Sequence, residues 1–435
     1  MMISLGAFGA GHAKKATFQA NTRACITGCM TRHPGDLRGF VKWGMAALLA
    51  FSVLFAAPGI SAVQRQSSVL AGDPIDLPLT NSMTWAAPSH LDPAEAWNSN
   101  PAWAAIFPDL EQSPLPLILG LYPSAALQST AGELRLMDLW LETRGVSSRI
   151  TIAGTFMDLE FPNPDWNVPH DLDAAWDQGY IPFVNLAAGT TQAGPRSAAD
   201  IANGLIDPAI HAWAAEFARW AQGGQKRAML APLQEMNAGW VSYGLDPEGF
   251  KAAYRHIQSI FAAEGVPGES VLWVFAPNGW SEPNHNFEYY YPGDEVVDAV
   301  GFSAFNFGSC SSYGDGWDLY EESIAPYITR MQAMAPLKPI FVAQTGTVAE
   351  GGDKDAWLRD TLLQLSNEEN VAGLIYFNVT KTEAGASACD PVDWRVFDPQ
   401  SGTGYQGFVD ALQTFEPAIT ETPPSYSIYI PLVMN

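Results

Sequence analysis

The sequence predicts one (β/α)8 barrel, the TIM barrel, over residues 112–415. Short apolar runs, typical of parallel strands buried on both faces, alternate with segments of helical spacing. Eight alternations fill roughly 300 residues, which suits a fold of about 250 residues that accepts insertions. The alternative is a doubly wound open sheet, which is disfavoured because no Gly-x-Gly-x-x-Gly follows the first strand.

The apolar runs and the periodic segments give the predicted elements in order. The strands are expected at 116–122, 149–156, 180–186, 227–235, 271–276, 296–305, 339–344 and 371–378. The helices are expected at 132–144, 171–178, 208–222, 247–264, 319–334, 353–365 and 404–415. The stretch between the fifth and sixth strands is expected to be loop with little helix.

The chain before the barrel predicts export. Arg38 and Lys42 precede an apolar run over 43–57, which is shorter than the roughly 20 residues of a membrane span. Residues 1–62 are therefore expected to hold an N-terminal extension and a signal peptide; a membrane anchor left uncut is the alternative. We expect a secreted, extracellular or cell-surface protein without stable membrane insertion after cleavage.

Two further segments flank the predicted barrel. Residues 63–111 are rich in Pro, Ser, Ala and Asn without periodicity, and they are expected to form an extended lead-in. Residues 416–435 begin as a Pro/Thr-rich linker and end in a short tail, for which a frayed terminal strand and a docking element are both open.

The charge of the chain indicates which classes of ligand it can bind, and its cysteines bear on the redox state of its compartment. The formal net charge is −24; residues 1–62 hold six of the 22 basic and one of the 46 acidic side chains, so the remaining chain carries −29. This charge excludes nucleic acid as a favoured ligand, whereas a neutral polysaccharide or oligosaccharide is not repelled. After export Cys310 and Cys389 remain, either paired in an oxidising compartment or buried as free thiols. We expect a monomer.

Polar side chains gather where the predicted strands end. Catalytic groups of such barrels lie at the carboxyl ends of the strands. Glu235 ends the fourth strand, with Asn237 and Trp240 just after it, and a carboxylic acid beside amide and aromatic groups suits cleavage of a glycosidic bond. A solvated Glu at a strand end is the alternative. The other residues at strand ends are Asp158, Glu160, Asn185, Gln234, Asn278, Trp280, Asn306, Gln344 and Asn378.

The sequence shows no motif that predicts a metal site or a cofactor site. The seven histidines are scattered, and no His-Glu-x-x-His or Cys-x-x-Cys occurs in the predicted mature chain. A Gly-x-Ser-x-Gly motif is also absent, which gives a serine hydrolase no support. We expect no cofactor and no metal, and a ligand whose hydroxyls are bound by amides and indoles.

Several motifs together resemble glycoside hydrolase family 26. They are Pro-Leu-Gln-Glu-Met-Asn-Ala-Gly-Trp at 232–240, Leu-Trp-Val-Phe-Ala-Pro-Asn at 272–278, Tyr-Tyr-Pro-Gly-Asp-Glu-Val-Val-Asp-Ala-Val-Gly at 290–301, Pro-Ile-Phe-Val-Ala-Gln-Thr-Gly at 339–346, Tyr-Phe-Asn at 376–378 and Asp-Trp-Arg at 393–395. The resemblance implies a (β/α)8 retaining enzyme, most often an endo-β-mannanase and sometimes active on mixed-linkage glucan or xylan. It gives Glu235 the role of general acid/base and Trp240 a role in sugar binding.

Three positions depart from that family. Gln344 stands where the family has its nucleophilic glutamate, Gln234 where it usually has a histidine, and Phe305 where a tyrosine commonly approaches the nucleophile. A retaining mechanism needs a second carboxylate about 5–5.5 Å from the acid, and an amide cannot attack the anomeric carbon as a carboxylate does.

Three functions therefore stay open. The first is a glycosidase that uses another carboxylate, for which Asp158, Glu160 and Asp315 are candidates. The second is a sugar-binding protein with impaired catalysis, and the third is a structural protein on the same scaffold. The expected substrate-binding residues are Gln234, Asn237, Trp240, Trp280, Asn306, Asn378 and Trp394.

Overall fold

The computed structural model describes residues 97–107, 117–124, 127–146, 150–190, 194–222, 226–312, 316–382 and 388–415. The predicted signal peptide, most of the predicted lead-in and the C-terminal tail lie outside the described residues. Asp315, one of the three candidate carboxylates, lies outside them as well.

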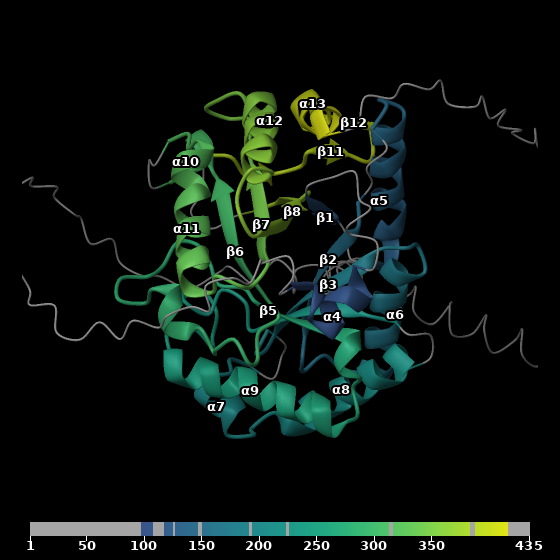
Figure 1. Ribbon diagram of the computed structural model, residues 1–435, viewed down its shortest axis with the longest axis vertical. Helices are drawn as coiled ribbons and strands as arrows, with labels where there is room; N and C mark the ends of the chain where they lie inside the picture. The colour runs from purple at the N-terminus through teal and green to yellow at the C-terminus, as the bar shows by residue number, and fades with distance from the viewer. Residues whose placement is uncertain are drawn as a thin grey trace, which may run out of the picture. The chain divides into compact units, whose positions relative to one another are not determined.

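Eight parallel strands close into a barrel in sequence order, which confirms the predicted TIM barrel (Figure 1). Pairing of β1 with β8 completes the ring and leaves no open edge. The strands are β1 (Ile118–Tyr122), β2 (Ile152–Asp158), β3 (Ile181–Ala187), β4 (Ala228–Pro232), β5 (Val271–Phe275), β6 (Ala299–Asn306), β7 (Ile340–Thr347) and β8 (Val371–Phe377).

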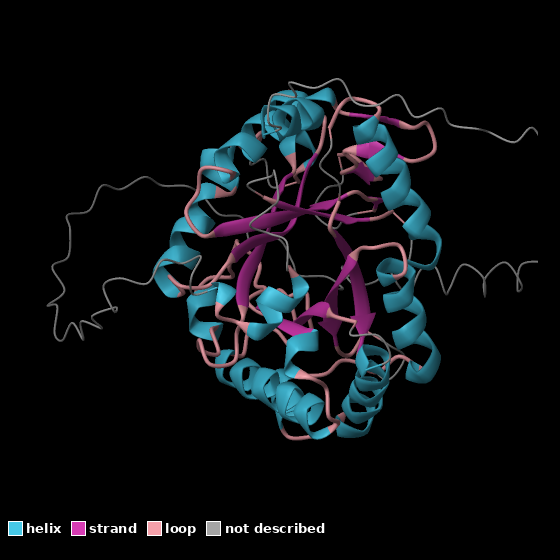
Figure 2. Cartoon of the chain, turned by 45° about the vertical axis from the view of Figure 1, so that its right-hand side comes forward, coloured by secondary structure: helices cyan, strands magenta, loops and turns pink. Residues whose placement is uncertain are grey.

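Helices surround the strands, as the cyan ring around the magenta barrel shows (Figure 2). The longer ones are α5 (Leu127–Glu142), α6 (Pro164–Trp176), α8 (Asp207–Gln222), α9 (Pro247–Ala263), α11 (Ala325–Met334), α12 (Lys354–Leu365) and α13 (Gln406–Phe415). Shorter ones are α4 (Pro101–Ile106), α7 (Ala198–Ala202), α10 (Tyr320–Ser323), η3 (Gly268–Ser270), η4 (Phe287–Tyr290) and η5 (Gly308–Cys310). None of the described helices has the length and apolarity that crossing a membrane requires.

Large apolar side chains fill the inside of the barrel. Phe183, Met229, Leu272, Phe341 and Ile375 come from five different strands, belong to one cluster and are fully buried. A barrel packed in this way has no pore, so a substrate can meet it only at an end of the strands.

Within the predicted lead-in, a short helix, α4, packs at the amino-terminal end of the barrel, where the sequence suggested extended chain. The Asn100 side chain caps α4 by accepting hydrogen bonds from the backbone N–H groups of Ala102 and Trp103. The Asn100 amide also donates to Asp298, just before β6, at 2.8 Å, and Trp103 packs on Phe341 of β7. The lead-in composition hid this helix because six residues are too few for a periodic pattern.

Other element boundaries also differ from the prediction. Helix α6 begins seven residues before the expected start at 171, because Pro164 starts it and the helix tolerates Pro169 inside. The predicted helix 319–334 is divided into α10 and α11, with Pro326 in the first turn of α11. Two small antiparallel pairs were not expected: β9 (Thr380–Lys381) with β10 (Val392–Asp393), and β11 (Phe397–Asp398) with β12 (Thr403–Gly404).

Candidate active site

Glu235 lies in a strained turn beyond β4, whereas the sequence placed it at the end of that strand. Leu233 and Glu235 have φ angles of 54° and 57°, a left-handed conformation that costs a residue with a Cβ roughly 1–2 kcal/mol. Hydrogen bonds to β3 and to the residue after β5 hold the turn: Leu233 N–H donates to Leu186 O at 2.7 Å, and Glu235 N–H to Ala276 O at 2.9 Å. Such strain persists where the surroundings over-determine it, and it is concentrated at functional sites.

The carboxylate of Glu235 is buried and held by two donors. Trp240 donates from Nε1 to Oε2 at 2.8 Å, and Asn278 donates from Nδ2 to Oε1 at 3.0 Å. Next to it in the turn, Gln234 is buried and its Oε1 has no hydrogen-bond partner in the described structure. The carboxylate is therefore fixed in one orientation by a residue of its own loop and a residue that follows β5.

Gln344 lies inside β7, three residues before the strand ends, rather than at the predicted strand end. The register of β7 shifts on both sides of this position, against β6 after Phe302 and against β8 between Val342 and Thr345. This is a β-bulge, which re-aims side chains and is frequent next to active sites. In a regular strand, successive side chains point to opposite faces of the sheet. Ala343 packs inside the barrel, so without the bulge the next side chain, Gln344, would point outward.

Pairing of Gln344 with Ser303 shows which way the amide faces. Phe302 and Ala304 belong to the outer core beneath the helices, so Ser303 between them faces inward. Gln344 is the Cα partner of Ser303, and residues paired across neighbouring strands share a face. The buried Gln344 side chain is thus directed to the inner side of the barrel.

A short path connects Glu235 with Gln344 at the same end of the barrel. Asn278, whose amide holds Glu235, forms an isolated parallel bridge with Ser303, and Gly279 N–H donates to Ser303 O at 2.9 Å. Ser303 in turn pairs with Gln344. The structure therefore places Glu235 and Gln344 at the same end of the barrel, with β5 and β6 between them.

Aromatic rings make up another part of this end of the barrel. Phe305 packs against Phe377 and Trp394, with ring centroids 5.6 and 5.0 Å apart. Tyr122 stacks on Phe156 at 5.3 Å and also meets Phe377. Phe305, which replaces the tyrosine usual in the resembled family, therefore belongs to an apolar cluster rather than to a polar network.

Tyr122 is a polar residue of this end that was not predicted. It accepts a hydrogen bond from Asn185 Nδ2 at 2.7 Å, and the amide oxygen of Asn185 is buried without a partner in the described structure. Burial raises the pKa of the Tyr122 phenol, and the nearby charge of Glu235 adds to the rise. The phenol therefore stays neutral. Tyr122 ends the first apolar run, so the rule that selected the other strand ends would have found it.

Three of the amides expected to bind sugar hydroxyls have protein partners instead. Asn237, Asn306 and Asn378 are fully buried. Asn306 donates to Thr347 Oγ1 and accepts from two backbone N–H groups, and Asn378 donates to Glu133 and Phe397 O. Trp394, also buried, lies under Phe305 and Phe307. We infer that these four residues support loops, and their direct contact with substrate stays a prediction.

The two described candidates for a second carboxylate are engaged with loops. Asp158 is buried and accepts hydrogen bonds from the Thr190 N–H and hydroxyl and from Glu160 N–H. Burial raises the pKa of Asp158, although these hydrogen bonds oppose the rise. Glu160 forms a forked ion pair with Arg196 at 2.8–3.1 Å. Neither carboxylate is free to approach a substrate without giving up these contacts.

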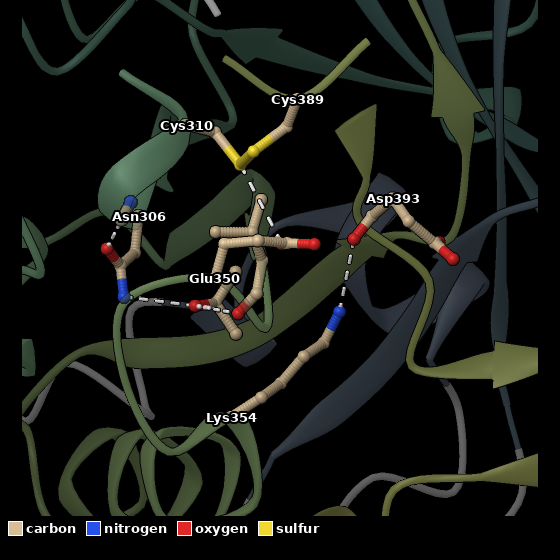
Figure 3. The surroundings of a disulfide bond; sticks show 9 residues. Asn306, Cys310, Glu350, Lys354, Cys389 and Asp393 are labelled. Atoms are coloured by element: carbon tan, nitrogen blue, oxygen red, sulfur yellow. Dashed lines mark hydrogen bonds between the residues drawn. A yellow bond between two sulfur atoms is a disulfide. The ribbon is translucent and has the colours of Figure 1, made fainter. Parts of the chain in front are cut away.

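Cys310 and Cys389 form a disulfide between the loops that follow β6 and β8, which answers the question that the sequence left open (Figure 3). The Glu350 carboxylate lies 3.7 Å from the Cys310 sulfur. Because both sulfurs are used in the disulfide, this group offers a metal one carboxylate and no thiolate.

Comparisons with known proteins agree with the motifs. The model of glycosyl hydrolase family 26 matches residues 198–356, a range that includes Glu235 and Gln344. Endoglucanase H of Acetivibrio thermocellus is 26% identical over 336 residues, which cover 72% of this chain and 35% of that protein. The chain thus spans about a third of the length of this curated relative.

Solved structures are similar to this chain at low sequence identity. GH26C from Muricauda sp. MAR_2010_75 aligns with a TM-score of 0.50 and 12% identity over 75% of this chain and 95% of that one. The catalytic domain of a GH26 endo-beta-1,4-mannanase from Bacillus sp. JAMB-750 aligns with a TM-score of 0.48 and 16% identity over 74% and 90% of the two chains. The predicted resemblance to glycoside hydrolase family 26 is confirmed by the family match and the curated relative.

Proposed function

Because the chain resembles glycoside hydrolase family 26, we propose that it is a secreted glycosidase acting on a β-linked neutral polysaccharide, β-mannan or mixed-linkage glucan. Glu235 is its general acid/base. One observation carries the proposal: a buried carboxylate is fixed by Trp240 and Asn278 at the carboxyl end of a packed barrel. The name of the curated relative favours a glucan, and the family resemblance favours mannan.

In the proposed reaction Glu235 donates its proton to the glycosidic oxygen as the bond to the leaving sugar breaks. The indole N–H of Trp240 and the amide of Asn278 orient the carboxylate for this transfer.

Gln344 cannot take the part of a second carboxylate in this reaction. An amide can hydrogen-bond a water or a sugar hydroxyl, but it carries no negative charge to balance an oxocarbenium-like transition state. Turnover therefore needs a second carboxylate. Asp158 and Glu160 could serve only after leaving their loop contacts, and Asp315 stays a candidate outside the described residues.

The second candidate function is polysaccharide binding without hydrolysis. The observation that favours it is the bulge that turns the Gln344 amide to the inner face, where the resembled family has its nucleophile. In this case Glu235 and its indole and amide neighbours bind the polymer, and no bond breaks.

The disulfide and the signal pattern support secretion, because disulfides persist in oxidising compartments. The monomeric state stays a prediction.

The test is release of reducing sugar from β-mannan and mixed-linkage glucan by the purified protein, beside Glu235→Gln and Gln344→Glu. We expect slow release that disappears in Glu235→Gln. Gln344→Glu is expected to be faster by several powers of ten, since restoring a nucleophile corresponds to on the order of 4–8 kcal/mol of barrier.

Each function gives a different result. Binding to polymer without release, together with release by Gln344→Glu alone, replaces the glycosidase by the binding protein. Neither binding nor release in all three proteins contradicts both functions and leaves the structural alternative.

A further inference from the structure

Three atoms that can bind a metal ion meet at the disulfide, and each comes from a different loop (Figure 3). Cys310 follows β6, Glu350 follows β7 and Cys389 follows β8. The two sulfurs and a carboxylate oxygen of Glu350 all lie within 4.8 Å of one another. None of these side chains has a part in the proposed reaction, so their meeting calls for a separate explanation.

The spacing of the carboxylate and the first sulfur suits a zinc ion. Glu350 Oε2 lies 3.7 Å from Cys310 Sγ. On a tetrahedral Zn²⁺, with sulfur at about 2.3 Å and a carboxylate oxygen at about 2.0–2.2 Å, these two ligand atoms stand about 3.5–3.7 Å apart. A sulfur in a disulfide has no proton to donate to the carboxylate. The distance therefore fits two ligands of one metal better than a hydrogen bond.

Backbone contacts hold Cys310 beside Glu350 without help from the disulfide. Ser309 N–H donates to Glu350 O at 3.0 Å, so the loop after β7 lies against η5. The start of η5 is fixed in turn, because Gly308 N–H donates to Asn306 Oδ1 at 3.1 Å. When the disulfide opens, this thiol and this carboxylate therefore stay close together.

The second thiol also stays near the other two ligands. The α-carbon of Cys389 is 5.1 Å from that of Cys310. Three residues after Cys389, Val392 pairs with Lys381 in the ladder of β9 and β10, which limits how far the loop can move. Two sulfurs on a tetrahedral zinc stand about 3.8 Å apart. Rotation of the two side chains about their Cα–Cβ bonds can give this separation without a change of the backbone.

We propose that the reduced protein binds Zn²⁺ through Cys310, Cys389 and Glu350, with water as the fourth ligand, and that formation of the disulfide releases the ion. Two thiolates select zinc over magnesium and calcium, which prefer oxygen ligands. Cys310 is buried and Glu350 is exposed, so the fourth position faces solvent. The ion joins three loops, whereas the disulfide joins two of them.

The exchange between the two forms balances as follows. A phosphine reductant gives two electrons to the disulfide; the bond between the sulfurs breaks, and water supplies a proton to each sulfur and its oxygen to the phosphine. Zn²⁺ then displaces the two thiol protons into solvent. In the opposite direction oxidised glutathione accepts the two electrons and two protons from solvent and becomes two thiols, and the ion leaves. Thiols are kept reduced in the cytosol, so the zinc form belongs to the chain before export.

The test compares zinc binding by the oxidised and the reduced protein. Equilibrium dialysis with metal analysis measures the affinity, and the phosphine serves as reductant. All proteins carry Cys25→Ser and Cys29→Ser, so that the thiols of the two loops are the only ones present. Alkylation and mass spectrometry count the free thiols before each measurement. In a second measurement Co²⁺ replaces Zn²⁺, because thiolates on tetrahedral cobalt give a strong visible absorption that an octahedral ion lacks.

Three variants separate the ligands from their surroundings. Glu350→Gln keeps the shape of the side chain and removes its charge, and Cys310→Ser/Cys389→Ser removes both thiolates. The matched control is Glu369→Gln, since Glu369 is an exposed carboxylate after α12 that does not belong to the group. Melting temperatures of the oxidised forms show whether each variant folds.

We expect the reduced protein to bind one Zn²⁺ per chain that the oxidised protein does not bind, and its melting temperature to rise by about 2–5 °C with zinc. Glu350→Gln is expected to weaken this binding about tenfold or more, and Glu369→Gln to leave it unchanged.

The site is overturned if reduction adds no bound zinc, if the double cysteine variant binds as well as the reduced protein, or if Co²⁺ shows only the octahedral spectrum. A disulfide that resists the reductant in the folded protein overturns it too, because the thiolates then never form. Equal affinities of Glu350→Gln and Glu369→Gln exclude the carboxylate as a ligand and contradict the proposed set. None of these outcomes changes the proposed function.

Discussion

Asn237 shows how one buried amide fixes two loops. It follows Glu235 by two residues, and its Nδ2 lies within hydrogen-bond distance of Asn278 O, Trp280 O and Ser281 Oγ. Its Oδ1 accepts from Asn278 N–H at 2.9 Å. The loop after β4 and the loop after β5 therefore share one polar centre, which explains why an amide, with both donors and an acceptor, stands at this position.

We expect Asn237→Ala to lower the free energy of unfolding by roughly 2–4 kcal/mol, because the backbone groups it satisfies become buried without partners. Urea unfolding of the purified variant measures this change. The control is Asn286→Ala, since Asn286 is exposed and makes no side-chain cap for η4, and a change within about 0.5 kcal/mol is expected there. Equal stability of Asn237→Ala and the unmodified protein would show that this amide is not a structural centre.

At the scale of elements, the barrel was predictable because its strands are continuous apolar runs. All eight predicted strands overlap observed ones, and the absence of a regular helix between β5 and β6 is matched by the short η4. Boundaries were less predictable where proline was involved, as in α6, where Pro169 lies inside the helix. A sequence pattern shows which residues are apolar. It does not show whether a helix will continue through a proline, which has no backbone N–H to donate.

The candidate site was predictable as a set of strand ends but not in its geometry. The left-handed turn at Glu235 and the bulge at Gln344 depend on hydrogen bonds to neighbouring strands, which no local pattern records. For the same reason the sequence could not tell an amide that faces the inner side of the barrel, such as Gln344, from an amide such as Asn306 that holds a loop. Tertiary partners, not residue type, decide between these roles.

The disulfide acts at the same scale, because it joins two loops that are 79 residues apart in the sequence. The loop after β8 carries Trp394, which packs on Phe305, so the bond also limits movement of the aromatic cluster. Closing a loop of this length in the unfolded chain corresponds to about 2–5 kcal/mol of stability.

We therefore expect the Cys310→Ser/Cys389→Ser double variant to lose about 2–5 kcal/mol in urea unfolding under oxidising conditions. The unmodified protein in excess dithiothreitol is expected to behave like the variant, which itself responds little to reductant. If the unmodified protein unfolds at the same urea concentration with and without reductant, the bond does not contribute in this way.

For the whole molecule, Lys354 is the one lysine or arginine among the described residues that is buried. The formal net charge is −24, and several of the described lysine and arginine side chains, such as Lys251, Arg255 and Arg359, form ion pairs near the surface. Lys354 differs, because it is 3% exposed and donates to the carbonyls of Trp394 at 3.1 Å and Asp393 at 3.4 Å (Figure 3). Burial lowers the pKa of Lys354 to about 7, although the charges of Asp393 and Glu350 oppose the shift.

The lowered pKa of Lys354 gives the stability a definite pH dependence. An unfolded lysine has a pKa of about 10.4, so between about pH 7 and pH 10.4 the unfolded chain binds this proton and the folded protein does not. Stability from this group therefore rises with pH across that window and is lowest below pH 7, where both states are charged. The upper limit of the rise is on the order of 4 kcal/mol.

Urea unfolding between pH 6.5 and 9.5 tests this dependence in the unmodified protein, Lys354→Met and Lys338→Met. Lys338 donates to Asp294 O at 2.8 Å near the surface, so its variant controls for the loss of one lysine. We expect Lys354→Met to be less stable than the unmodified protein at pH 9.5, where it lacks the hydrogen bonds to the two carbonyls, and closer to it at pH 6.5, where burying the charge is costly. The difference in unfolding free energy between these two proteins should therefore grow with pH, whereas the difference for Lys338→Met should stay constant. If the difference in unfolding free energy between Lys354→Met and the unmodified protein does not change with pH, Lys354 keeps its proton in the folded state. The neighbouring carboxylates and carbonyls would then stabilise the charged form more than burial destabilises it.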